Sequence, residues 1–67
     1  MMEVLYHIAD NRFIVRKNNR YFFVIFKKSF IDEITKEDIE SILRQGYWQA
    51  GYDGEKREAI VSLISSI

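Results

Sequence analysis

The chain is short and electrically balanced: its 67 residues carry ten basic and ten acidic side chains, which disfavours a dedicated binder of polyanions. It contains no cysteine, which excludes disulfides and thiolate metal sites, and it has neither a secretory signal nor an apolar run long enough to cross a bilayer. We therefore expect a single cytoplasmic α+β domain over residues 1–67, for which association is the remaining source of extra stability.

Three strand-like runs open the chain, and two short turns separate them. Residues 4–9, 12–17 and 21–26 are rich in β-branched and aromatic side chains, which suit a pleated sheet. Asp10-Asn11 and Asn18-Asn19 lie between these runs, and asparagine tolerates the positive φ that two-residue hairpin turns require. The sequence therefore predicts a three-stranded antiparallel meander.

Two-residue turns also fix the register of the strands. Around Asn18-Asn19 the predicted pairs are Lys17 with Arg20, Val15 with Phe22, Ile14 with Phe23, and Phe13 with Val24. Around Asp10-Asn11 they are Ile8 with Phe13, His7 with Ile14, and Tyr6 with Val15. Because successive side chains point to opposite sides of a sheet, two sets result. The apolar side collects Val4, Tyr6, Ile8, Phe13, Val15, Phe22, Val24 and Phe26. The mixed side collects Leu5, His7, Arg12, Ile14, Arg16, Tyr21, Phe23, Ile25 and Lys27.

Two helices are predicted after the strands. Residues 29–34 form a connection, and Thr35 to Asp38 follow the pattern of a capping box at the start of a helix that ends near Gly46. An aromatic connector, residues 46–54, then leads to a second helix over residues 54–65, with Asp53 as its cap. The apolar residues of the two helices recur at helical spacing: Ile39, Ile42 and Leu43 in the first, and Ala59, Ile60, Leu63, Ile64 and Ile67 in the second. The predicted order is βββαα, with both helices on the apolar side of the sheet.

Catalytic and cofactor chemistry find little support in this sequence. His7 is the single histidine and has neither a second histidine nor a cysteine with which to hold a metal. Neighbouring acids, as in Asp32-Glu33 and Glu37-Asp38, fall at turns and helix starts, where they act as solvated caps. The sequence also lacks a glycine-rich phosphate loop and a nucleophile motif. We expect no enzyme activity, no cofactor and no metal.

The mixed side carries the candidate partner-binding residues, which are Arg12, Arg16, Tyr21, Phe23, Ile25 and Lys27. Rings on a sheet can stack nucleic-acid bases while Arg and Lys neutralise phosphates, but the same residue types are also enriched at protein interfaces. Trp48 in the connector either closes one end of the core or, if exposed, anchors a partner. Balanced charge favours protein as the partner. We therefore expect a non-enzymatic protein-binding module of the regulator or inhibitor type that self-associates as a homodimer. The alternative is a small nucleic-acid-binding domain that uses the mixed side.

Overall fold

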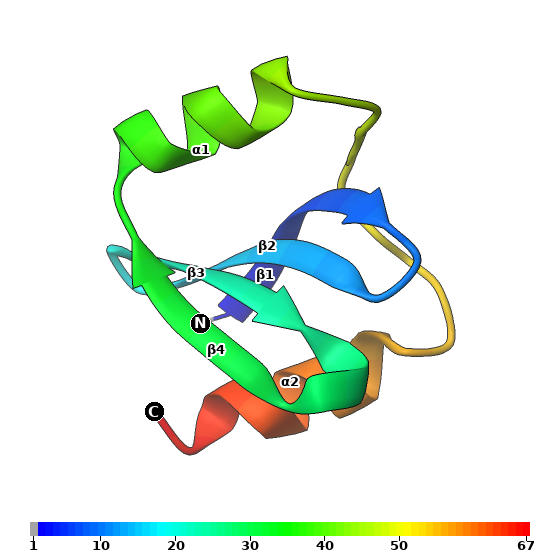
Figure 1. Ribbon diagram of the computed structural model, residues 1–67. Coiled ribbons are helices and arrows are strands. Elements are labelled where there is room, and N and C mark those ends of the chain that lie inside the picture. The colour runs from blue at the N-terminus through cyan, green and yellow to red at the C-terminus, as the bar shows by residue number, and fades with distance from the viewer. Residues whose placement is uncertain (1) are drawn as a thin grey trace.

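A computed structural model describes residues 2–67 and shows an antiparallel sheet held between two helices (Figure 1). The strands are β1 (Met2–Ala9), β2 (Arg12–Lys17), β3 (Arg20–Ile25), β4 (Phe30–Ile34) and β5 (Gln49–Ala50). The helices are α1 (Lys36–Arg44), α2 (Arg57–Ser65) and a short 3₁₀ turn, η1 (Phe26–Lys28). Within the described residues the strand order is β4-β3-β2-β1-β5. The α+β class is confirmed, but the sheet has five strands and not three.

The two additional strands, β4 and β5, extend the meander at its two edges. Ser29 ends η1 with a left-handed backbone (φ 49°), which turns the chain back so that β4 pairs antiparallel with β3. The sequence prediction treated β4 as a connection, because its two acids interrupt any alternation of apolar residues. At the other edge, β5 pairs with β1 only at Tyr6 and His7. Such a short pairing has no sequence signature of its own.

The register of β2 and β3 is confirmed. Lys17 lies opposite Arg20 and Ile14 lies opposite Phe23, as a two-residue Asn18-Asn19 turn requires. Asn18 has φ 58°, the left-handed conformation that asparagine tolerates better than most residues. This hairpin is therefore determined by local turn chemistry.

The predicted register of β1 is wrong. His7 pairs with Phe13 and Tyr6 pairs with Ile14, because the pairing shifts between His7 and Ala9 and again between Val4 and Tyr6. Neither residue of the Asp10-Asn11 turn has a positive φ, so this turn is not of the primed type that a regular two-residue hairpin needs. The strand accommodates the turn with bulge-like irregularities. As a result Tyr6 moves to the mixed side and His7 moves to the apolar side.

The two helices lie on opposite sides of the sheet, which differs from the prediction (Figure 1). Helix α2 packs on the apolar side, where its residues Ile60 and Ile64 are fully buried. The core on this side consists of Val4, Phe13, Val15, Phe22, Val24, Ile60 and Ile64. Helix α1 covers the other side, and the connector passes around the β5 edge from one side to the other. The apolar row on the mixed side, which includes the fully buried Ile14, explains why that side also needs a cover.

The starts of the two helices differ in how well the sequence predicts them. Thr35 and Asp38 form the predicted capping box, with Asp38 N donating to Thr35 Oγ1 (3.1 Å) and Thr35 N donating to Asp38 Oδ2 (2.9 Å). Helix α2 begins at Arg57 and not near residue 54, and Asp53 does not cap it. At Gly54 a Cβ atom would lie 2.3 Å from the Tyr52 hydroxyl, so the close approach of Tyr52 requires glycine there. None of the helices within residues 2–67 is long and apolar enough to span a membrane.

Candidate functional site

The structure separates the candidate partner-binding residues into four places. Arg16 and Tyr21 line a hollow beside Ile39 and Glu40 of α1. Phe23 lines a second hollow, between β4 and α1. The remaining residues of the mixed side, Arg12, Ile25 and Lys27, line a third at the β1–β2 turn, and Trp48 lies on the connector. Since Tyr21 and Phe23 are both only partly accessible, the sheet offers no continuous platform of rings and cations.

Three of the basic residues between Arg12 and Lys28 are used in internal contacts. Arg16 forms an ion pair with Glu3 on the neighbouring strand. Lys17 Nζ donates to the backbone carbonyl oxygens of Ser65 (3.3 Å) and Ile67 at the end of α2, where carbonyls lack helical partners and a cation is favourable. These contacts tie the β2–β3 hairpin to its surroundings and engage the charges of Arg16 and Lys17 within the protein.

The third internally paired base, Arg20, binds Glu33 across β3 and β4. Arg20 Nη2 donates to Glu33 Oε1 (2.9 Å) and Arg20 Nε donates to Glu33 Oε2 (3.2 Å), which is the two-pronged geometry of a guanidinium with a carboxylate. This hydrogen bonding lowers the pKa of Glu33 and raises the pKa of Arg20, and the charge attraction adds to both shifts. The Arg20 guanidinium also lies 5.2 Å from the centre of the Phe22 ring.

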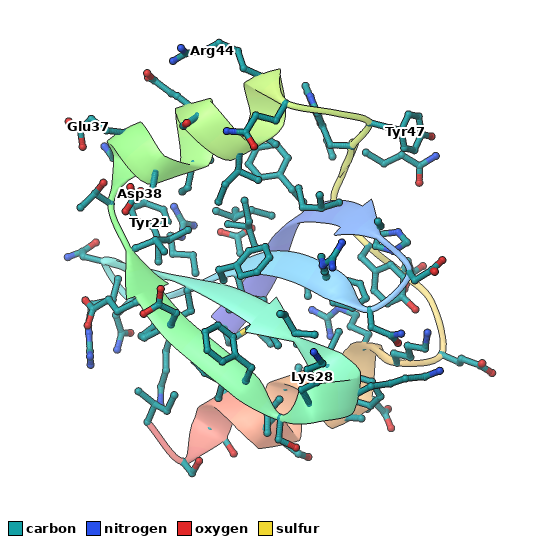
Figure 2. All side chains as sticks on the ribbon, in the orientation of Figure 1. Tyr21, Lys28, Glu37, Asp38, Arg44 and Tyr47 are labelled. Atoms are coloured by element: carbon teal, nitrogen blue, oxygen red, sulfur yellow. The ribbon has the colours of Figure 1, made fainter. Side chains whose placement is uncertain are left out.

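The other three bases, Arg12, Lys27 and Lys28, form no ion pair within residues 2–67. They line one depression, here called the basic hollow, together with Ala9, Asp10, Asn11 and Ile25. Figure 2 shows Lys28 well separated from Glu37 and Asp38 in the acidic first turn of α1. Three cations without a carboxylate partner among residues 2–67 therefore lie together at the turn end of the sheet.

Two exposed rings, Tyr47 and Trp48, form what we call the aromatic patch. Tyr47 is 73% exposed, and Figure 2 shows it projecting away from the body of the protein. Trp48 is 41% exposed and meets the Tyr6 ring edge-on, with 5.3 Å between ring centres. The Trp48 side chain is thus partly packed against the protein and partly open to solvent. Trp48 does not belong to the buried core cluster of residues 2–67, so it does not close the core, and its role at an interface stays a prediction.

Next to the aromatic patch lies a second depression, here called the edge hollow. It is lined by His7, Ile8, Ala9, Asp10, Gly46, Tyr47 and Gln49. It borders the stretch of β1 beyond the two residues that pair with β5. Ala9 and Asp10 belong to both the edge hollow and the basic hollow, so the two depressions adjoin at the β1–β2 turn.

His7 is held by packing on the apolar side. Its ring stacks on Phe13 (4.8 Å between centres) and meets Tyr52 edge-on (5.1 Å). Its Nε2–H donates to the backbone carbonyl of Asp10 (3.2 Å). These contacts give the ring a structural role, and they connect the core to the β1–β2 turn. Residues 2–67 contain no group of three or more His, Asp or Glu side chains arranged to hold a metal ion.

Comparisons with known proteins add no functional information. No protein-family model, no curated protein and no solved structure matches the chain. Any function must therefore be argued from the surface itself. Sequence reasoning did not select two of its residues, Tyr47 and Lys28. The Tyr47-Trp48 and Lys27-Lys28 pairs were visible signals, but strand alternation cannot assign residues in a connector or a 3₁₀ turn to a side.

Proposed function

We propose that the chain is a non-enzymatic protein-binding module whose contact surface is the aromatic patch together with the edge hollow. The observation that carries this proposal is the exposure of two large rings at consecutive positions of the connector, Tyr47 and Trp48, with Trp48 already held by Tyr6. Large rings that are held in place lose little conformational freedom on binding, and tyrosine and tryptophan dominate the energetics of protein interfaces.

The edge hollow adds backbone groups to this surface. On one side of the two residues that pair with β5, Gly51 N donates to the Leu5 carbonyl (2.6 Å). On the other side, at Ile8 and Ala9, the outer edge of β1 has no neighbouring strand among residues 2–67. An exposed strand edge offers hydrogen-bonding groups in the spacing that another peptide chain can match. A protein partner thus meets rings and main-chain groups at the same place.

The nucleic-acid alternative is less well supported in the form that the sequence predicted. Base stacking on the mixed side requires accessible rings, and Tyr21 and Phe23 are partly buried on the side that α1 covers. Arg16, one of the candidate cations, is engaged in an internal ion pair, and the neighbouring Lys17 is engaged at the end of α2. The formal net charge of zero also provides no long-range attraction for a polyanion.

The test compares two exposed aromatic residues at opposite edges of the sheet. Immobilised wild type, Tyr47→Ser and the matched control Phe30→Ser are each incubated with nuclease-treated lysate of the source cells; Phe30, on β4, is 45% exposed. We expect a protein that is retained by wild type and by Phe30→Ser but lost with Tyr47→Ser. Equal retention by all three would contradict the proposal, as would a species that is retained from untreated lysate but not from nuclease-treated lysate.

Two further measurements refine this test. Trp48 is the single tryptophan, so its emission should shift to shorter wavelength when the purified partner covers it. Sedimentation equilibrium over a range of protein concentrations measures whether the 8.0 kDa chain forms a homodimer and whether Tyr47→Ser abolishes it. An emission spectrum unchanged at saturating partner would place the contact elsewhere.

A further inference from the structure

We infer that the basic hollow binds an acidic segment of the protein partner, so that the partner carries Asp or Glu residues beside the part that covers the aromatic patch. This inference rests on the proposed function and extends it by naming the chemistry of the partner. It is carried by three observations, namely the construction of the hollow, its unpaired cations and its position.

The basic hollow is fixed in shape by Asn11, which joins three parts of the chain. Phe26 N donates to the Asn11 carbonyl (2.7 Å), which attaches η1 to the β1–β2 turn. Lys56 Nζ donates to Asn11 Oδ1 (3.1 Å), which attaches the start of α2. Because Ser29 then ends η1 in a left-handed conformation, Lys27 and Lys28 are presented from a defined turn and not from a free loop. A preformed site loses less entropy on binding than a flexible one.

The charges of the hollow are available to a ligand. Arg12, Lys27 and Lys28 form no ion pair within residues 2–67, whereas Arg16 and Arg20 each hold a carboxylate. Arg12 lies opposite Ile25 on β3, and both residues line the hollow. A guanidinium binds a carboxylate through two parallel hydrogen bonds, and ammonium groups nearby add attraction.

The position of the hollow links it to the proposed contact surface. The basic and edge hollows share Ala9 and Asp10, so a chain lying over Tyr47 continues directly towards Arg12. Asp10 is the one acid among the residues lining the two hollows, and it lies between them. A protein segment can place an uncharged residue there and its acids beyond it.

The experiment uses two synthetic anions of equal net charge. A fluorescein-labelled octaglutamate peptide and a labelled oligothymidylate are titrated with the protein at low salt, and binding is followed by anisotropy. The test variant Lys27→Gln/Lys28→Gln is compared with the control Lys36→Gln/Arg44→Gln, which removes the same charge at α1. We expect the test variant to bind octaglutamate roughly five- to tenfold more weakly than wild type. The control should change the affinity less than about twofold.

Three results would overturn the inference: absence of octaglutamate binding, equal weakening in both double variants, or tighter binding of the oligothymidylate than of the peptide. The last result would assign the hollow to nucleic acid. The Tyr47→Ser variant separates this inference from the proposed function. If Tyr47→Ser loses the partner while octaglutamate fails to bind, only the acidic segment is wrong. If octaglutamate binds at the hollow while Tyr47→Ser keeps the partner, only the aromatic contact surface is wrong.

Discussion

The two sides of the sheet are built from the same strands but are buried to different degrees. On the α2 side, Phe13, Val15 and Val24 are fully buried against Ile60 and Ile64. On the α1 side the rings of Tyr21 and Phe23 remain partly accessible, and charged residues line the hollows between sheet and helix. The apolar side chains that face α2 pack closely against that helix. On the other side, the Arg and Tyr side chains among the residues that face α1 leave space at the margins of the contact. The closely packed α2 side is therefore the side that stabilises the fold.

The largest effect is expected when one buried isoleucine in each helix is replaced by alanine, and this pair of variants tests the difference between the two sides. Ile60→Ala creates a cavity in the closed core and should cost about 2–5 kcal/mol, which is comparable with the whole stability of so small a domain. Ile39→Ala, at an 8% exposed position on α1, should fall at the lower end of that range because the partly open surroundings can relax. Urea denaturation of both variants measures the two costs, and a larger cost for Ile39→Ala would reverse our ranking of the two sides.

A smaller effect is expected from the cap that starts α1. Thr35→Ala removes the acceptor of the Asp38 amide and should cost about 1 kcal/mol. Helix α2 has no side-chain cap, so no substitution at its start can destabilise the protein by removing one. Thermal unfolding followed by circular dichroism measures the change, with the conservative Thr35→Ser as a control that should recover most of it. If Thr35→Ala is as stable as wild type, tertiary packing and not the cap determines where α1 begins.

The smallest effect concerns the Arg20–Glu33 pair at the rim of the α2 side, where Glu33 lies opposite Phe22. The pKa of Glu33 is lowered in the folded protein by its hydrogen bonds to Arg20. The contribution of ionised Glu33 to folding stability is therefore fully present above the pKa that Glu33 has in the unfolded chain. It is lost as the pH falls through the lower pKa that Glu33 has in the folded protein. Both side chains are 52% exposed, so solvent screens the pair and the contribution is modest.

Urea midpoints of wild type and Glu33→Gln at neutral and at acidic pH test this linkage. Wild type should be slightly more stable than the variant at neutral pH, and the difference should narrow as the pH is lowered. A difference that stays constant over this range would mean that the ion pair contributes nothing beyond side-chain packing.

The parts of the fold that depend on local chemistry were predictable from the sequence. The Asn18-Asn19 hairpin with its register follows from turn geometry, and the capping box of α1 follows from Thr35 and Asp38. The apolar assignment of Phe13, Val15, Phe22 and Val24 follows from alternation along β2 and β3. In each case the determining residues lie within a few positions of one another.

The remaining features depend on contacts between distant segments. Periodicity places apolar residues on one stripe of α1 but does not state which side of the sheet receives that stripe, and the connection through β4 leads to the mixed side. The exposure of Tyr47 is likewise set by the path of the connector around β5. The basic hollow forms only because Asn11 brings η1 and the start of α2 together. For these reasons the candidate surface had to be taken from the structure, although Arg12, Ile25, Lys27 and Trp48 were selected from the sequence.

The irregular pairing of β1 has a consequence for how the chain can change in length. β1 has eight residues and β2 has six, and the two that lack a partner on β2 are Leu5 and Ile8. Leu5 accepts from Gly51 N (2.6 Å), so its deletion would disturb the β5 edge, whereas deletion of Ile8 is expected to leave the pairs between β1 and β2 as they are. This strand therefore contains one spare residue, Ile8, and a variant shortened there is expected to keep the same interior.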